Sequence, residues 1–140
     1  MIDKDTFILY NKPFSNHSNV STSVPIEYKY QQSINLLPEK NYYKTIHILR
    51  PDTEIISELP KVINNNIIYF KSINKKCIDH GFSGNFTTII NLLKDIYINY
   101  KNNSLITRSR DNNILIYYQA KQKNINIHWY NEKLFNIIYE

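Results

Sequence analysis

The chain has 140 residues, a mass of 16.7 kDa, a hydrophobic fraction of 42% and a net charge of +5. This size and apolar content predict one folded domain over residues 1–140 and exclude wholesale disorder. A single cysteine excludes an internal disulfide. No apolar run reaches the ~18 residues of a membrane span, and the acidic start does not have the pattern of a signal peptide. We therefore expect a cytoplasmic protein that does not bind membranes.

The balance of residue types favours β-structure and a basic surface. Isoleucine and the 12 tyrosines dominate the apolar residues, and both suit the pleated surface of a sheet. With only two glycines, asparagine is expected to occupy many turns, because it tolerates positive φ. The pI of about 9.2 permits an acidic protein or a nucleic acid as partner.

The N-terminal half predicts several strands. Residues 6–10 and 44–50 are short apolar runs, and 26–31 alternate between apolar and charged side chains, as in a half-buried strand. Asp52 can cap a short helix over about 52–59, which must end before Pro60. Residues 67–73 are almost continuously apolar and predict a central strand.

The stretch 75–88 holds both glycines and the only cysteine, and it leads into the clearest helical pattern. Apolar residues from Phe86 to Tyr100 repeat at i, i+3 and i+4, which predicts one long amphipathic helix over about 86–101. Ser83 or Asn85 suits the N-cap of this helix. Gly81 and Gly84 are expected to supply positive φ in the reversal between strand 67–73 and the helix.

The C-terminal third predicts a β-meander. Residues 105–110 and 114–120 flank an Asn-Asn pair that suits a hairpin turn, and 134–139 form a last strand or short helix. Residues 124–130 alternate strictly, with Ile125, Ile127 and Trp129 toward the core and His128 outward. The whole chain predicts an α+β fold with a mainly antiparallel sheet of about five to seven strands, packed by the two helices.

Candidate catalytic residues are Cys77, His80, His128 and His47. A thiolate nucleophile at Cys77 needs a base, which His47 or His128 would supply from elsewhere in the chain; the same cysteine also suits a small buried thiol. Cys-x-x-His is half of a zinc pattern whose second half is missing, so no metal is expected. The glycine stretch has neither phosphate-loop nor dinucleotide fingerprint, so no cofactor is expected.

A binding surface follows from the predicted hairpin register. Arginine and tyrosine are frequent anchors of protein interfaces, and basic and aromatic side chains on an open sheet also meet phosphates and stack on bases. An ordinary solvated face is the alternative. The side chains that this register places on one polar face are Arg108, Arg110, Tyr117, His128 and Tyr130.

These features favour a small interaction protein that binds and inhibits another macromolecule. Immunity proteins of bacterial toxin systems and phage or viral counter-defence proteins are of this kind. The expected partner is another protein, a toxin or a host or defence factor, with nucleic acid as the alternative at the basic and aromatic face. The alternative function is enzymatic: a small metal-independent ribonuclease using His128 with Arg108, Arg110 or His47, or a cysteine-dependent effector using Cys77.

Overall fold

A computed structural model describes residues 4–10, 26–38, 42–49, 53–73, 76–100, 112–130 and 135–137. These residues form an α+β fold with a five-stranded sheet and a separate two-stranded sheet. The helical segments are α1 (Ile26–Gln32), the 3-10 turn η3 (Ser33–Leu36), α2 (Phe86–Leu93), α3 (Ile96–Tyr100) and α5 (Asn112–Gln122). The strands are β1 (Thr6–Tyr10), β2 (Thr45–Leu49), β3 (Thr53–Ile55), β4 (Ile67–Ile73), β5 (Lys76–Gly84), β6 (Asn126–Tyr130) and β7 (Phe135–Ile137).

The larger sheet has the order β1-β2-β5-β4-β6 and is mixed. The inner pairs β2–β5 and β5–β4 are antiparallel, whereas the outer pairs β1–β2 and β4–β6 are parallel. The prediction of a mainly antiparallel sheet is therefore wrong. Helices precede β2 and β6 along the chain, and such long connections allow each of these strands to return parallel to a neighbour.

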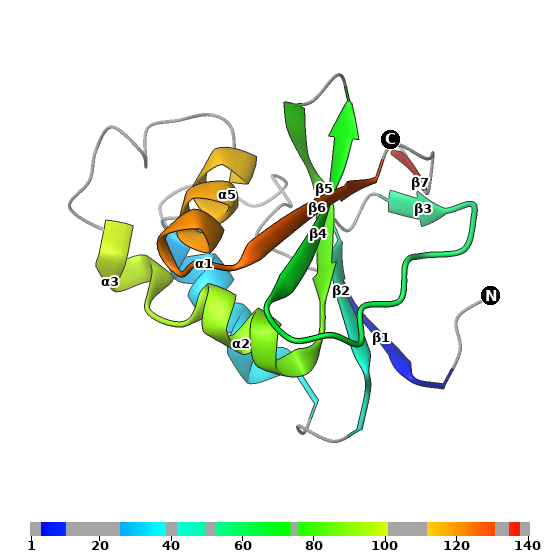
Figure 1. The fold of residues 1–140 in the computed structure, drawn as a ribbon, viewed down its shortest axis with the longest axis horizontal. Helices are drawn as coiled ribbons and strands as arrows, with labels where there is room; N and C mark the ends of the chain where they lie inside the picture. Colours follow the sequence, from blue (N-terminus) through cyan, green and yellow to red (C-terminus); the bar gives the residue numbers. More distant parts are fainter. Residues whose placement is uncertain are drawn as a thin grey trace, which may run out of the picture.

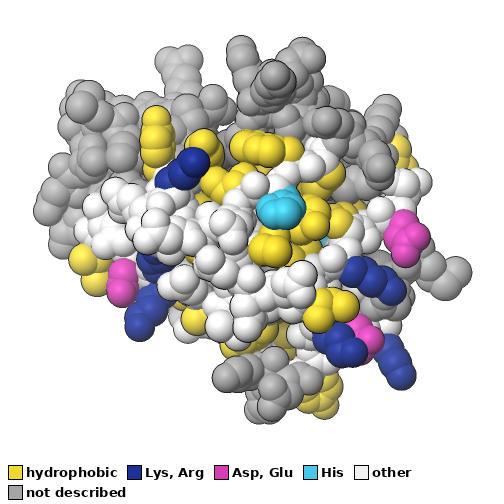
Figure 2. All heavy atoms as spheres, viewed as in Figure 1, with side chains coloured by type: hydrophobic (Ala, Val, Ile, Leu, Met, Phe, Trp, Pro, Cys, Tyr) yellow, Lys and Arg dark blue, Asp and Glu magenta, His cyan; other side chains and the backbone are white. Residues whose placement is uncertain are grey.

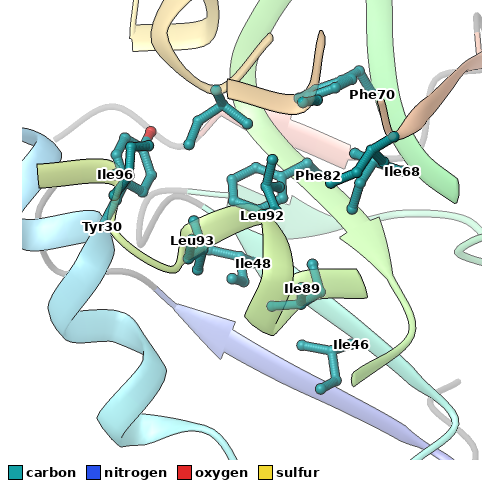
Figure 3. Close-up of a cluster of buried hydrophobic side chains, with 13 residues drawn as sticks. Tyr30, Ile46, Ile48, Ile68, Phe70, Phe82, Ile89, Leu92, Leu93 and Ile96 are labelled. Carbon is teal, nitrogen blue, oxygen red and sulfur yellow. The ribbon is translucent and has the colours of Figure 1, made fainter. Parts of the chain in front are cut away.

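The five-stranded sheet separates two unequal layers. The helices cover one face, and β3 with β7 lies on the other side (Figure 1). Ile89, Leu92 and Leu93 of α2 lie against strand side chains such as Ile48 and Phe82 in the main core (Figure 3). Each such side chain contributes roughly 1.5–3 kcal/mol when it leaves water, so the packing of the helices on this face is a major source of stability. Among the described residues, no helix is long and apolar enough to cross a membrane.

The segment predicted as strand 26–31 is instead helix α1. Tyr30 and Ser33 are buried, while Ile34 and Leu37 pack against the main core. Their spacing of i, i+3, i+4 and i+7 is the helical period. The alternation of apolar residues ended at Tyr30, whereas the helical pattern continues to Leu37, so the longer pattern determined the structure.

The predicted long helix over about 86–101 is two short helices. Lys94 has extended backbone (ψ 131°) and Asp95 is left-handed (φ 61°), which ends α2 before α3 begins. The Lys123 ammonium donates hydrogen bonds to the carbonyl oxygens of Asn91 and, at 2.7 Å, Lys94. Gln119 Nε2 also donates to the Lys94 carbonyl, at 3.2 Å. Contacts from the C-terminal end of α5 thus satisfy the carbonyls that the break leaves without helical partners.

Two other predicted segments adopt a different type of secondary structure. Within the predicted helix over about 52–59, residues 53–55 form strand β3, which pairs with β7, and residues 56–59 form neither helix nor strand. The proposed strand 114–120 lies within helix α5, which buries Ile116, Gln119 and Ala120 at i, i+3 and i+4. The proposed strand 105–110 lies outside the described residues. The C-terminal part is not a meander, because β6 pairs with β4 and β7 pairs with β3.

The stretch around the glycines is a strand that passes directly into a helix. Asn85 is the N-cap of α2, as predicted, and accepts the backbone N–H of Thr88 at 2.9 Å. Neither glycine has positive φ, so their expected role in a reversal is wrong. A Cβ at Gly81 would clash with Leu49 Cδ2 and would lie 2.8 Å from the carbonyl oxygen of Ile48. Close approach of neighbouring strands, rather than an unusual backbone angle, therefore requires glycine there.

Candidate functional site

Strand β6 forms one edge of the five-stranded sheet. It has β4 on one side, and the described part of the chain places no strand on the other. The strand follows α5 through a tight turn in which Asn124 is left-handed (φ 55°). The backbone N–H of Ile125 donates to the carbonyl of Ala120 at 2.9 Å, and the Ile125 side chain is buried. This anchor fixes where β6 leaves the helical layer.

The side chains of β6 alternate between the two faces of the sheet. Trp129 is opposite Phe70 of β4, on the face that the helices cover, and His128 is opposite Tyr69 on the other face. The alternation predicted for Ile125, Ile127 and Trp129 is thus present. Trp129 is nevertheless 42% exposed, and the described residues place no further strand beside β6 to cover its ring.

The exposed tryptophan is held in an aromatic group. Its ring centroid lies 5.8 Å from that of Phe70 and 6.0 Å from that of Tyr117 on α5. Tyr117 in turn contacts Tyr118, which is 48% exposed, and the Lys121 ammonium lies 5.6 Å from the Tyr117 centroid. These contacts limit the rotamers of Trp129 while leaving much of its ring in water.

On the other face, the rings of Tyr69 and His128 are 5.2 Å apart. Figure 2 shows a histidine side chain among hydrophobic side chains near the centre of the molecular face in this view, with most charged side chains nearer the rim. We refer to the aromatic side chains on and beside the edge strand as the β6 aromatic edge: Tyr69, Tyr117, Tyr118, His128 and Trp129.

The five residues predicted to bind a partner do not share one sheet face. Tyr117 lies on α5 beside Trp129, whereas His128 and Tyr130 are on the opposite face of the sheet. Tyr130 is half-buried and packs against the small cluster around Leu49. Arg108 and Arg110 lie outside the described residues. The prediction of a single face depended on a hairpin of strands 105–110 and 114–120, but the second of these segments lies in a helix. The binding roles themselves stay predictions.

The histidine candidates are far apart. His47 and Ser83 are each 1% exposed, and His47 Nδ1 lies 2.5 Å from Ser83 Oγ in a hydrogen bond that links β2 to β5. His128 lies in the same cross-strand row, beyond Ser83 and Tyr69. Three strand intervals of about 4.8 Å separate the His47 and His128 backbones by about 14 Å. A serine beside a histidine is the arrangement of an activated nucleophile, but this pair is buried from any substrate.

The remaining candidates lie on β5, where the backbone of Cys77 pairs with that of Ser72. The side chains of Cys77 and His80 lie outside the described part of the structure. The described residues contain no group of three or more histidine, cysteine, aspartate or glutamate side chains that could hold a metal ion. The structure therefore brings together aromatic side chains rather than a set of catalytic groups within the part of the chain it describes.

The sequence patterns did not indicate Trp129, Tyr118 or Tyr69 as parts of a candidate site. Alternation correctly assigned Trp129 to the core face, but only the strand order shows that Trp129 lies at the edge of that face. Comparisons with models of protein families, with curated proteins and with solved structures found no match for the chain.

Proposed function

We propose that this chain is a protein-binding module and that its partner contacts the β6 aromatic edge. The observation that carries the proposal is Trp129, which is 42% exposed on an edge strand and held by ring contacts with Phe70 and Tyr117. Tryptophan and tyrosine provide much of the binding energy at protein interfaces. A side chain whose rotamers are already limited loses less conformational entropy on binding, so the arrangement favours recognition.

The charge of the chain suggests the chemistry of the partner. The net charge is +5, and Lys121 is exposed beside the aromatic group. A positive protein associates faster with an acidic surface, and a carboxylate of the partner next to Lys121 would add a local contact. We also propose that binding inhibits the partner, as an immunity protein blocks a toxin or a counter-defence protein blocks a host factor.

The enzymatic alternatives receive less support. The ribonuclease hypothesis joined His128 with His47 or with Arg108 and Arg110; His47 is buried three strands away, and the arginines lie outside the described residues. The thiol hypothesis depends on Cys77, whose side chain also lies outside them. Nucleic acid at the aromatic edge is the alternative that the binding experiment must separate, because stacked rings beside a lysine also suit bases and phosphates.

The test is affinity capture from cell extract with the wild-type chain, Trp129→Ala and Tyr42→Ala, with and without nuclease. Tyr42 is a matched control, because it is 69% exposed and precedes β2, away from β6. We expect at least one protein that wild type and Tyr42→Ala capture equally and that Trp129→Ala captures about 30-fold less, which corresponds to ~2 kcal/mol at an interface hot spot. Equal capture by all three chains would refute the proposal, and capture lost after nuclease treatment would favour nucleic acid.

A further inference from the structure

The backbone of β6 leaves hydrogen-bonding groups directed at the open edge. The N–H of Asn126 donates to the carbonyl of Asn66 at 2.9 Å, so Asn126 directs its backbone groups toward β4. In a strand, the N–H and C=O of one residue point to the same side, and successive residues alternate. Ile127 and Trp129 therefore direct both backbone groups away from β4, where the described residues provide no strand.

Strand β6 lacks several of the features that keep edge strands apart. Natural edges are protected by lysine, by proline or by a bulge. Residues Asn126–Tyr130 include neither residue type, and the pairing with β4 runs without a register shift. At the opposite edge, β1 is half-buried except for Tyr10, whereas β6 exposes Asn126, His128 and Trp129. Of the two sheet edges, β6 is the one more open to pairing.

We propose that a second copy of the chain occupies this edge. Two β6 strands would pair antiparallel about a two-fold axis at His128, so that the sheet continues from one copy into the other. In this register, Ile127 of one copy is opposite Trp129 of the second copy. The two residues exchange their outward N–H and C=O groups, and the isoleucine side chain covers the exposed indole ring.

The symmetry of the strand favours this occupant over an unrelated extended segment. The two outward-facing residues flank His128 equally, so one two-fold operation satisfies all of their backbone groups and uses the same residues on both copies. No charged residue lies within β6 to oppose its symmetric equivalent. The contact is one short strand, and interfaces below ~1,200 Å² are typically weak. We therefore expect a dissociation constant on the order of 100 µM.

This inference rests on the proposed function in one respect, since it uses the same edge and adds that the second copy and the partner compete for it. A weak dimer would protect the aromatic edge at high protein concentration and release it to a tighter-binding partner. The partner-bound form would then contain one copy of the chain.

The test is sedimentation velocity of wild type, His128→Lys and Tyr42→Lys from about 10 µM to 1 mM, a range around the expected constant. Wild type and Tyr42→Lys should self-associate equally. His128→Lys should associate at least about tenfold more weakly, because it places two ammonium groups opposite each other and puts lysine on the edge. His128 is exposed, so thermal unfolding should show that the variant is folded.

Amide exchange measured by NMR identifies the interface. In the dimer, the Ile127 and Trp129 amides should become protected as concentration rises, while that of Asn126, which is bonded to Asn66, is protected throughout. A monomer at every concentration, a dimer that His128→Lys leaves unchanged, or exchange at Ile127 and Trp129 that ignores concentration would overturn the inference. Trp129-dependent capture of a partner by a monomeric chain would leave the proposed function intact, and a dimer without such capture would remove only that function.

Discussion

Replacing Asn85 with alanine tests how the sheet is joined to its helical layer. The Asn85 side chain is buried where β5 passes into α2, and its Oδ1 accepts the Thr88 N–H at 2.9 Å. Its Nδ2 donates to the Ile63 carbonyl at 3.2 Å and to Asn65 Oδ1 at 2.5 Å. One amide group therefore caps the helix and holds the preceding loop.

The expected loss follows from these three contacts. Removing an asparagine N-cap costs about 1 kcal/mol. Each of the two bonds to the loop contributes about 1 kcal/mol at most, and less where water replaces the lost partner. Because Ile63 and Asn65 are exposed, water can replace part of these bonds, and we expect Asn85→Ala to lower the free energy of unfolding by about 1–3 kcal/mol in total.

Two further variants divide this loss. Asn85→Ser keeps an oxygen that can cap the helix but removes both amide donors, so it should cost about 1–2 kcal/mol. Asn91→Ala, at an exposed position in α2, should change stability by less than about 0.5 kcal/mol. Urea unfolding followed by far-UV circular dichroism at micromolar protein measures all four chains. Equal losses in Asn85→Ser and Asn85→Ala, or no loss in either, would refute this division.

Three other predictions follow from the described contacts. Gly81→Ala should lower the free energy of unfolding by about 1–3 kcal/mol, and by more than Gly84→Ala does. A Cβ at Gly81 would meet a backbone oxygen as well as Leu49, whereas the atom nearest to a Cβ at Gly84 is a movable side-chain end, so equal urea midpoints would contradict this. Burial lowers the pKa of Lys123 below 10.5, more than Asp95 raises it. The unfolded chain then keeps this proton to higher pH than the folded chain, so the free energy of unfolding should rise with pH just below 10.5. This rise should be smaller in Lys123→Met, and equal pH dependence of the two chains in urea unfolding would count against it. Trp129 is the only tryptophan, so its fluorescence should be quenched by acrylamide in dilute protein and less at millimolar concentration; quenching independent of concentration would argue against a covered edge.

Local patterns predicted the elements whose side chains sort by hydrophobicity alone. Strands β1, β2 and β4 lie where apolar runs placed them, and the alternation in β6 assigned Ile127 and Trp129 to the core face. The Asn85 cap could also be predicted from the sequence, because a capping side chain acts within its own turn of helix. Each of these features depends on residues that are neighbours in sequence.

Hydrophobicity did not identify α5, because part of its buried face is polar. Gln119 is fully buried, with its amide bonded to the Lys94 carbonyl, and Lys123 just beyond the helix binds the same carbonyl. These bonds also help to explain why the continuous apolar pattern of 86–100 divides at Asp95. Contacts between polar residues that are far apart in sequence thus help to determine helices α2 and α5, and the sequence of either segment alone does not predict them.

The sequence by itself determined the α+β class, four of the strands and which face of β6 is apolar. It did so because burial of alternating side chains and the cap of a helix are local interactions. Only the tertiary structure decided that β6 ends the sheet, that α5 brings Tyr117 against Trp129, and that His47 is buried beside Ser83. Exposure of an apolar side chain depends on which strand lies next to it, and strand order follows from contacts between distant residues rather than from the pattern of any one strand.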